Sequence, residues 1–484
     1  MPINSFLYPG AKVTPAYEVA NSCRFDASSS AYMHKTPSST GVEEKFTFSF
    51  WIKFNSAHSA NQCVLFIEGD NGADDYVEIA FKPQLDIQFN NGTYSNYVTN
   101  RKFRDPSAWY HIVIAVDTTQ STAGNRLKLY VNGTQETSFA TETVITQNDV
   151  LQANTSGKKM WLNAHYNGPK NFVDGYLAEV VWIDGTQYAA SDFGEFDEDS
   201  PTIWKPKDVS GLTFGTNGFY LDFEDSSNLG NDANGGTDLT EVNLAATDQS
   251  TDTCTNNFAT LNPLTIVAGA SLTLSEGNLT FNGTSTDAGA KATFGVSSGK
   301  WYWEVKTKLS DDNSSGSDRI LVATETVRQI TSATDPNSQG IWGIQSRSGS
   351  GATLNSFTNG TFSNGNSGST GFNNGTIIGV ALDADNGKLY FHKDGTYTDL
   401  SGNTGDPANG TNPTFTGLPT DGTFLFPYFE NRPNVTPSSQ VNFGGTQSFS
   451  ISSGNSDGNG YGNFEYSVPS GYYALNTKNL AEYG

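Results

Sequence analysis

The sequence of 484 residues predicts an all-β protein made of two antiparallel β-sandwiches joined by an ordered connector. Charged residues make up only 16% of the chain and 50 residues are Gly, a composition typical of strands separated by polar turns. Apolar residues alternate with polar ones over Lys45–Phe54, as in a strand with one buried face. Two hairpin patterns with Gly-containing turns, 127–133 and 379–395, lie far apart in the chain. Because a chain of this length exceeds what one core supports, we expect two sandwiches.

The first sandwich is predicted over residues 22–186, after an N-terminal arm of residues 1–21. Every second residue of Lys45–Phe54 is apolar, so one face of this strand carries Phe46, Phe48, Phe50, Ile52 and Phe54. Further strands are expected at residues 63–68, 76–81, 85–89, 110–116, 127–131, 159–164 and 175–183. Strands at intervals of roughly ten residues, with turns between them, are typical of a sandwich.

The connector is predicted over residues 187–263. It contains an acidic run at 195–199 and a run rich in Gly and Asn at 229–236. Apolar anchors are scattered between these runs: Trp204, Phe214, Phe219, Tyr220, Leu221 and Phe223. A disordered linker carries fewer aromatic residues, so we expect an ordered segment that packs against its neighbours, with a short helical turn at 189–193.

The second sandwich, with a C-terminal extension, is predicted over residues 264–484. Its strands are expected at residues 272–274, 279–281, 300–307, 320–323, 340–345, 376–382, 388–391, 424–430 and 440–443. Residues 355–374 and 401–417 are predicted to be long loops, since their Gly and Asn residues suit turns with positive φ.

The composition excludes several classes of partner. A formal net charge of −23 repels a phosphate backbone, so no nucleic acid is expected. A membrane-spanning helix needs about 20 consecutive apolar residues, and no apolar stretch of the sequence is that long. Residues 1–20 also lack the apolar segment of a signal peptide. The three cysteines have no repeated spacing, so neither a disulfide framework nor a zinc site of the CxxC type is expected.

The first domain resembles the laminin-G-like members of the concanavalin A-like lectin/glucanase superfamily. The residues that carry the resemblance are 46–53, 109–117, 127–133 and 175–182, in the order that this family uses. The second domain resembles a SPRY domain, through 298–305, the hairpin at 379–395, 425–429 and 441–445. The resemblance implies a concanavalin A-like jelly roll followed by a SPRY-like sandwich.

The two domains in series, with the connector residues 243–264 and the C-terminal 468–480, are similar to virion proteins of tailed bacteriophages. This resemblance implies a tail-fibre, appendage or capsid-decorating protein of the virion, assembled in the host cytoplasm. It also implies a homo-oligomer, with a trimer as the family-level expectation, or many copies on one particle.

No catalytic residues are predicted, and we expect a non-enzymatic protein. Retaining glucanases of this superfamily carry a Glu-x-Asp-x-x-Glu arrangement on one strand, which places two carboxylates in one cleft. The nearest match begins at Glu195-Phe196-Asp197, but Ser200 stands where the second Glu belongs. This match also lies in the connector, outside any predicted strand, so a solvated acidic loop is the better interpretation.

Calcium is the one metal that the sequence suggests. Asp70, Asn71, Asp74 and Asp75 offer oxygen ligands in a turn between two predicted strands, and laminin-G-like relatives often bind calcium. The alternative is an exposed loop with Asx turns.

Carbohydrate binding needs exposed aromatic rings beside amide and carboxylate groups, because sugar C–H faces stack on rings while hydroxyls seek polar partners. The loop aromatics that could supply such rings are Tyr94, Tyr97, Tyr166, Phe357, Phe362 and Phe372. The alternative is that these side chains anchor their own loops.

Three functions compete at this point. An adhesin would bind host-surface polysaccharide. A structural decoration or adaptor would instead bind other virion proteins, with the N-terminal arm as its anchor. A glycan hydrolase, the third candidate, lacks the expected pair of carboxylates.

Overall fold

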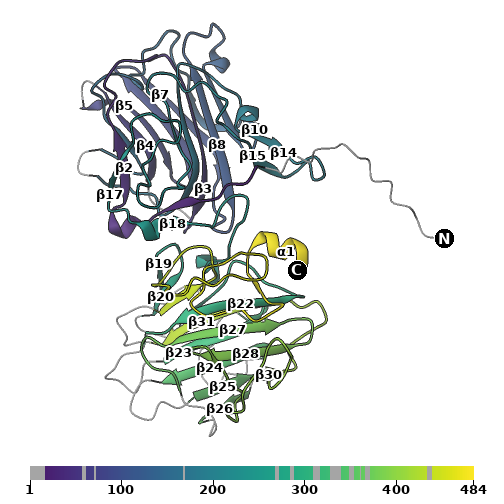
Figure 1. Cartoon of the computed structure of the whole chain (residues 1–484). Helices are drawn as coiled ribbons and strands as arrows, with labels where there is room; N and C mark the ends of the chain where they lie inside the picture. Colours follow the sequence, from purple (N-terminus) through teal and green to yellow (C-terminus); the bar gives the residue numbers. More distant parts are fainter. Residues whose placement is uncertain are drawn as a thin grey trace, which may run out of the picture.

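The computed structural model consists of two β-sandwiches stacked end to end, with the C-terminal helix α1 (Thr477–Tyr483) at the level where they meet (Figure 1). It describes residues 17–56, 61–69, 72–166, 169–266, 272–283, 288–308, 317–327, 339–347, 354–359, 361–365, 371–432 and 439–484. The all-β prediction is confirmed, since α1 is the one α-helix among these residues. Short 3-10 turns occur at Ala27–Ser29, Ala123–Asn125, Ala190–Asp192, Ala246–Asp248 and Pro263–Thr265.

The first sandwich contains two antiparallel sheets. The covered sheet has the order β10-β9-β8-β3-β13-β1-β18, with β16 beside β13. Its strands are β1 (Ser22–Phe25), β3 (Lys45–Phe54), β8 (Trp109–Asp117), β9 (Leu127–Val131), β10 (Thr134–Glu136), β13 (Gly175–Asp184), β16 (Phe219–Leu221) and β18 (Gln249–Ser250). The open sheet has the order β11-β7-β6-β5-β4-β12-β2-β17. Its strands are β2 (Tyr32–Lys35), β4 (Gln62–Gly69), β5 (Gly72–Phe81), β6 (Gln84–Asn91), β7 (Tyr94–Lys102), β11 (Phe139–Thr143), β12 (Met160–Leu162) and β17 (Thr240–Val242).

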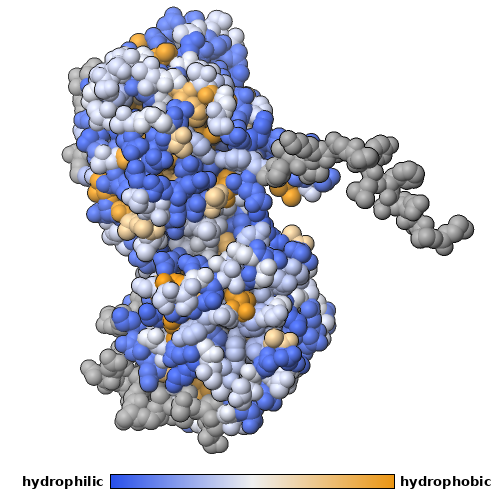
Figure 2. All heavy atoms as spheres, viewed as in Figure 1, coloured by the Kyte–Doolittle hydropathy of each residue, from blue (hydrophilic) through white to orange (hydrophobic). Residues whose placement is uncertain are grey.

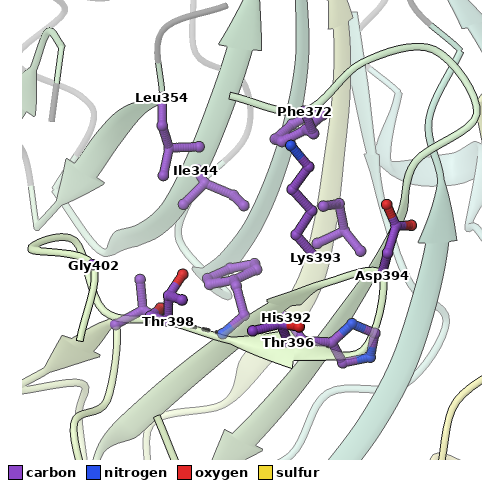
Figure 3. Close-up of a pocket in the computed structure, with 12 residues that line it drawn as sticks. Ile344, Leu354, Phe372, His392, Lys393, Asp394, Thr396, Thr398 and Gly402 are labelled. Atoms are coloured by element: carbon purple, nitrogen blue, oxygen red, sulfur yellow. Dashed lines mark hydrogen bonds between the residues drawn. The ribbon is translucent and has the colours of Figure 1, made fainter. Parts of the chain in front are cut away.

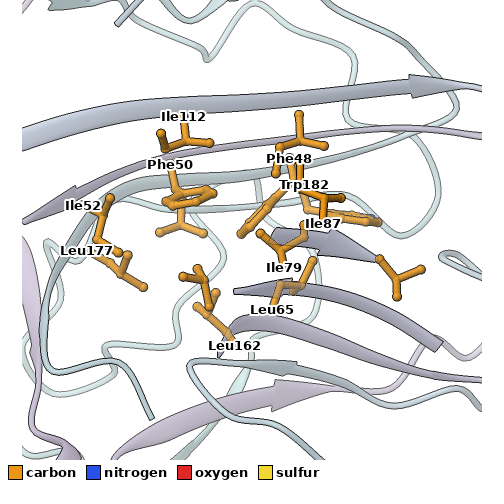
Figure 4. Close-up of a cluster of buried hydrophobic side chains, with 14 of the residues drawn as sticks. Phe48, Phe50, Ile52, Leu65, Ile79, Ile87, Ile112, Leu162, Leu177 and Trp182 are labelled. Carbon is orange, nitrogen blue, oxygen red and sulfur yellow. The ribbon is translucent and has the colours of Figure 1, made fainter. Parts of the chain in front are cut away.

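The apolar face predicted for Lys45–Phe54 lies between these two sheets (Figure 4). Phe48 and Phe50 of β3 face Leu65 and Ile79 of the open sheet, and Trp182 of β13 packs beside them. All five side chains are essentially inaccessible to water. Alternation with period two therefore places the core residues of both sheets in one layer.

The connector supplies strands to the first sandwich. Strand β16 pairs with β13, β17 with β2, and β18 with β1. Its aromatic residues Phe193, Phe214 and Tyr220 pack on the outer face of the covered sheet, against Val113 and Val181. As a result both faces of that sheet are buried, and every residue of β13 is inaccessible. The short ribbon β14 (Gly194–Phe196) and β15 (Trp204–Pro206) projects from this side.

The second sandwich also has two sheets. One has the order β19-β20-β32-β22-β27-β28-β29, with β30 beside β28 and β33 beside β22. Its strands are β19 (Leu272–Ser275), β20 (Thr280–Gly283), β22 (Lys300–Lys306), β27 (Ile377–Asp383), β28 (Lys388–Lys393), β29 (Thr396–Tyr397), β30 (Phe415–Thr416), β32 (Ser439–Asn442) and β33 (Tyr473–Ala474). The other has the order β21-β31-β23-β24-β25-β26. Its strands are β21 (Ala288–Lys291), β23 (Ser317–Thr324), β24 (Ile341–Arg347), β25 (Leu354–Thr358), β26 (Thr361–Ser363) and β31 (Leu425–Arg432).

Charged side chains join the two sandwiches. Arg24 of β1 binds Asp248 at 2.9 Å and Glu276, next to β19, at 3.0 Å. Nearby, the Tyr176 hydroxyl donates to the carbonyl of Gly277 at 3.2 Å. In helix α1, the Lys478 ammonium lies 2.7 Å from the Glu18 carboxylate. These contacts join the two sandwiches across the seam between them.

The structure corrects three local predictions. Tyr94 and Tyr97, expected in a loop, belong to strand β7. Residues 355–374, expected to be one long loop, contain most of β25 and all of β26. Glu195, placed outside any strand, lies in β14. In each case the strand is short or rich in polar residues, so its sequence lacks the alternation that marks a half-buried strand.

Candidate ligand-binding face

The outer side of the open sheet carries an aromatic cluster in which Phe66 and Trp161 are buried and Tyr76 and Tyr166 are partly buried. Among the described residues, the connector packs on the covered sheet, whereas on the open sheet strands β2, β6 and β7 keep several partly buried or exposed residues. The open sheet turns its alternate residues outward, so Leu65 and Ile67 point into the core while Phe66 points out.

An aromatic cluster occupies one half of this side. Phe66 is its centre, with the ring of Tyr76 stacked 5.5 Å away and the ring of Tyr166 stacked 5.3 Å away. Trp161 of β12 lies 6.0 Å from Phe66, and the Lys159 ammonium lies 5.5 Å from the Trp161 ring. Tyr76 and Tyr166 are half-buried, so each presents part of its ring to solvent. We call these five residues and the polar network below the aromatic face.

A polar network continues the aromatic face across β5, β6 and β7. The Tyr76 hydroxyl donates to Gln88 Oε1 at 3.0 Å, and Gln88 Nε2 donates to Asp86 at 2.9 Å. Asp86 also accepts from Asn96 at 2.8 Å and from the Lys82 ammonium at 2.8 Å. The amides are therefore held in fixed orientations by a central carboxylate.

This arrangement suits a carbohydrate. Stacked rings offer apolar surface to sugar C–H groups, and an oriented row of amides offers donors and acceptors to hydroxyls. Asp86 is poorly placed to act as a nucleophile, because three donors already occupy its oxygens. The chemistry of the aromatic face is therefore that of binding.

A cavity of about 430 Å³ opens between the sheets of the second sandwich (Figure 3). Its floor is apolar and consists of the core residues Ile344, Leu354, Phe372, Ile378 and Phe391. Its rim carries Lys393, Asp394 and three threonines. The Lys393 side chain extends toward Phe372 and its ammonium donates to the Gly371 carbonyl at 2.9 Å. The mixture of apolar floor and polar rim is typical of small-ligand pockets, so this cavity is a second candidate site.

His392, next to Phe391 in β28, also lines this cavity, although its imidazole packs against Tyr302. Its Nδ1 accepts from the backbone N–H groups of Gly379 and Gly395, at 3.2 and 3.1 Å. Nε2 therefore carries the proton and donates to the Tyr302 hydroxyl at 2.8 Å, which in turn donates to Glu304 at 2.9 Å. Burial lowers the pKa of His392 to about 3, so the imidazole is neutral and acts as a structural group.

The predicted ligand residues of the first domain have different surroundings. Tyr94 is 48% exposed, and its hydroxyl accepts from Asn96 at 3.0 Å on the aromatic face. Tyr166 also belongs to that face. Tyr97, by contrast, is buried in the core, where its hydroxyl accepts from the backbone N–H of Ile145 at 3.1 Å. Tyr97 also lines a small pocket of about 160 Å³ with Phe139 and Leu127, and its role in ligand binding stays a prediction.

The predicted ligand residues of the second domain are not brought together at the surface. Phe357 is buried under Phe362, with ring centroids 5.2 Å apart, and the guanidinium of Arg319 lies 5.4 Å from the Phe357 ring. Phe362 is half-buried. Phe372 is buried as well, but it lines the cavity of Figure 3. Sugar binding by any of these side chains stays a prediction.

Most of the predicted calcium ligands cannot be placed. Asp70 and Asn71 lie outside the described residues, as does the side chain of Asp74. Asp75 is buried and accepts from Gln152 Nε2 at 3.0 Å. Within the described ranges, no three His, Cys, Asp or Glu side chains gather as metal ligands would. A calcium site therefore stays an untested prediction.

The acidic run of the connector has a local structural role. Asp197 accepts from the backbone N–H groups of Asp199 and Ser200, at 3.0 and 2.9 Å. The Lys205 ammonium lies 3.4 Å from Asp197 and 3.6 Å from Glu195. The run therefore caps a turn of the β14–β15 ribbon, which agrees with the interpretation as an acidic loop.

The sequence reasoning missed Phe66, Tyr76 and Trp161. All three were inside or beside predicted strands, where aromatic residues are expected to be core. Alternation gives no signal here, because Val64, Leu65, Phe66 and Ile67 are all apolar, and a register shift in β4 places both Val64 and Leu65 in the core while Phe66 faces away. Nor does the local sequence reveal what covers the outer face, which depends on segments far along the chain.

Comparison with known protein families agrees with this architecture. Residues 26–189 match the concanavalin A-like lectin/glucanases superfamily, and residues 300–463 match the SPRY domain. The chain therefore carries a concanavalin A-like domain followed by a SPRY domain. Domains of these two classes are typically binding modules.

Three solved structures illustrate the similarity. The SPRY domain of human HERC1 is 19% identical, with 37% of this chain and 96% of that chain covered at a TM-score of 0.27. The TRIM65 PSpry domain is 17% identical, with 38% of this chain and 90% of that chain covered at a TM-score of 0.25. The SAP-like pentraxin from Limulus polyphemus is 12% identical, with 35% of this chain and 78% of that chain covered at a TM-score of 0.26. No curated protein sequence matches the chain. Over the part of the chain that the structure describes, no helix is long and apolar enough to cross a membrane.

Proposed function

We propose that this protein is a non-enzymatic surface protein of a bacteriophage virion, an adhesin of a tail fibre or appendage, that binds host-surface glycan through the aromatic face. The observation that carries the proposal is the continuity of that face. Half-buried Tyr76 and Tyr166 adjoin the oriented amides of half-buried Gln88 and buried Asn96 on the outer side of the open sheet. Ring surface next to ordered amides is what a sugar requires.

The virion location rests on the resemblance of the domain series and connector to tailed-phage proteins. A particle surface carries many copies, and many weak sugar contacts then combine into strong attachment. An acidic protein with a formal charge of −23 also stays soluble at high local density.

The alternative is a purely structural decoration or adaptor. Two observations favour this alternative. The second domain is a SPRY domain, a class that typically serves as a binding module, and it contains a cavity of about 430 Å³ with an apolar floor. Such a cavity fits apolar side chains of another virion protein. The proposed adhesin and this alternative are compatible in one chain, since they use different domains.

Two measurements test the proposal. Immunogold labelling of intact particles locates the protein, and we expect label on fibres or appendages. A microbial glycan array probed with the multivalent full-length chain then tests binding. We expect retention on a subset of polysaccharides, with no reducing ends released. Retention by no glycan at high valency would contradict the adhesin function, and reducing-end release would favour a hydrolase.

A further inference from the structure

A polar pocket, distinct from the cavity of Figure 3, lies between the two domains and away from the aromatic face. It has a volume of about 360 Å³ and is lined by three segments far apart in the chain: 18–21, 246–258 and 445–478. These come from the start of the first sandwich, from the connector and from the extension of the second sandwich. Figures 1 and 2 show the narrowing between the two lobes at this level. Pockets between domains are common ligand sites.

The lining of this seam pocket has no net charge. Among its residues only Glu18 and Lys478 are charged, and they pair with each other at 2.7 Å. The other polar lining residues are amides and hydroxyls. In a chain of net charge −23, an uncharged lining of this kind favours a neutral ligand over a cation or an anion.

Two side-chain amides of the seam pocket are free to form hydrogen bonds with a ligand. Among the described residues, the side chains of Gln447 and Asn463 have no hydrogen-bond partner, whereas Ser250 and Thr251 are bonded to Thr446 and Gly445. Gln447 is half-buried and Asn463 exposed, so both can reach a ligand that enters from solvent. Each amide offers donors and an acceptor together, which matches a hydroxyl.

Tyr461 supplies an aromatic ring to the same pocket. It is half-buried, and the Lys478 ammonium lies 5.5 Å from its ring centroid. Lys478 is itself held by Glu18, so the ring is fixed by a contact across the seam. A ring positioned beside free amides reproduces the chemistry of the aromatic face at a second place.

Gln447 also lines a neighbouring hollow of about 790 Å³, whose lining includes Phe449 and the charged side chains of Arg24, Glu276, Lys306 and Lys308, so an uncharged ligand is favoured at the seam pocket alone. Because one side chain lines both spaces, they lie next to each other along the seam. A ligand that fills the seam pocket can therefore continue past Gln447. This geometry suits a chain of sugar units better than a single sugar.

From these observations we infer that the seam pocket is a second saccharide subsite, which takes an uncharged segment of a polysaccharide through Gln447, Asn463 and Tyr461. This inference rests on the proposed function. It adds that both domains contribute to one site and that the protein holds a glycan chain at two separate places. Two subsites on one protein raise the affinity for long chains over short ones.

The test uses the full-length chain and the glycans that it retains on the array. Gln447→Ala and Asn463→Ala, each with an unchanged thermal unfolding midpoint, are compared with Gln147→Ala, an exposed glutamine of the first sandwich. We expect each seam variant to bind long neutral polysaccharides about three- to tenfold more weakly, the loss of one or two ordinary hydrogen bonds. Gln147→Ala is expected to bind as the unchanged chain does. Tyr461→Phe is expected to retain binding and Tyr461→Ala to lose it.

Each outcome is decisive. If glycans are retained but only changes on the aromatic face weaken their binding, the seam subsite is wrong while the adhesin function stands. If the retained glycans are all polyanionic, the inference of a neutral ligand is overturned. Retention of no glycan overturns the adhesin function and the seam subsite together. Weaker binding of the seam variants to long chains, with short oligosaccharides less affected, supports the subsite.

Discussion

The ammonium of Lys53 lies 2.7 Å from the carboxylate of Asp252, and both side chains are only 1% exposed. Lys53 belongs to β3 of the covered sheet, and Asp252 follows β18 at the end of the connector. The ammonium also donates to Asn257 Oδ1 at 2.7 Å and to the Phe258 carbonyl at 3.1 Å. Phe258 packs with Tyr302 and Phe464 of the second sandwich. A single buried cation therefore fixes the chain where it passes from one domain to the other.

Removal of this cation is expected to destabilise the protein strongly. Lys53→Met leaves Asp252 as a buried charge without its partner, a change that costs about 3–5 kcal/mol. Urea unfolding measures the loss. The pair Arg101–Glu136, in which the Arg101 side chain is 48% exposed, provides the control, since Arg101→Met is expected to cost less than about 1 kcal/mol. A loss below 1 kcal/mol for Lys53→Met would show that the pair does not support the domain junction.

Glu179 is expected to make stability depend on pH. It lies in a bulge of β13 with φ +49°, and it accepts from the hydroxyls of Tyr17 and Tyr220 at 3.0 and 2.9 Å. Burial raises its pKa to about 7, above its ordinary value of 4.5. The folded state therefore holds this proton more tightly than the unfolded chain. Its contribution to stability is present below about pH 4.5 and is lost as the pH rises through about 7.

Two buried histidines change the stability with pH in the direction opposite to Glu179, so the pH range of the measurement must avoid their titration. Burial lowers the pKa values of His111 and His392 to about 3, so they destabilise the fold as the pH falls below 6.5. Between pH 6.5 and 8 the Glu179 effect dominates over theirs. We expect the free energy of unfolding to fall over this interval and to fall less in Glu179→Gln. Equal slopes for both proteins would rule out the assigned role of Glu179.

Gly379 is expected to tolerate no side chain. It is the cross-strand partner of His392, and a methyl group at this position would overlap the imidazole. Gly379→Ala must then displace His392 from Tyr302 or move the strand, which costs about 1–3 kcal/mol. Gly211→Ala is a matched control, because a methyl group there meets no neighbour. Thermal unfolding of the two variants measures the difference, and similar midpoints would contradict the packing described for His392.

The core of each sandwich was predictable from local pattern, whereas the surface was not. Lys45–Phe54 alternates apart from Trp51, and its strand has the predicted bounds. The same alternation gave no indication that Ser49 and Lys53, on the polar side of this strand, are buried too. Their burial comes from the connector and from Asp252, about 200 residues away in the chain. Long-range cover of this kind leaves no local signal.

The same limit applies to the candidate site. Tyr94 and Tyr166 were proposed as ligand residues because they were expected in loops, yet Tyr94 is in a strand. Tyr97, three residues away, points into the core since successive strand residues face opposite sides. To decide which of the two tyrosines faces outward, one needs the bounds of strand β7 and its register with β6. That register includes a shift that the composition does not predict.

Binding of retained glycan by variants of the aromatic face tests the account most directly. Tyr166→Ala and Gln88→Ala remove a stacked ring and an oriented amide, and Tyr188→Ala, on the covered-sheet side, is the matched control. We expect each of the first two to weaken monovalent binding about three- to tenfold, and their combination to abolish attachment to host cells. Tyr188→Ala is expected to bind normally. Undiminished glycan binding by the folded double variant would contradict the central claim.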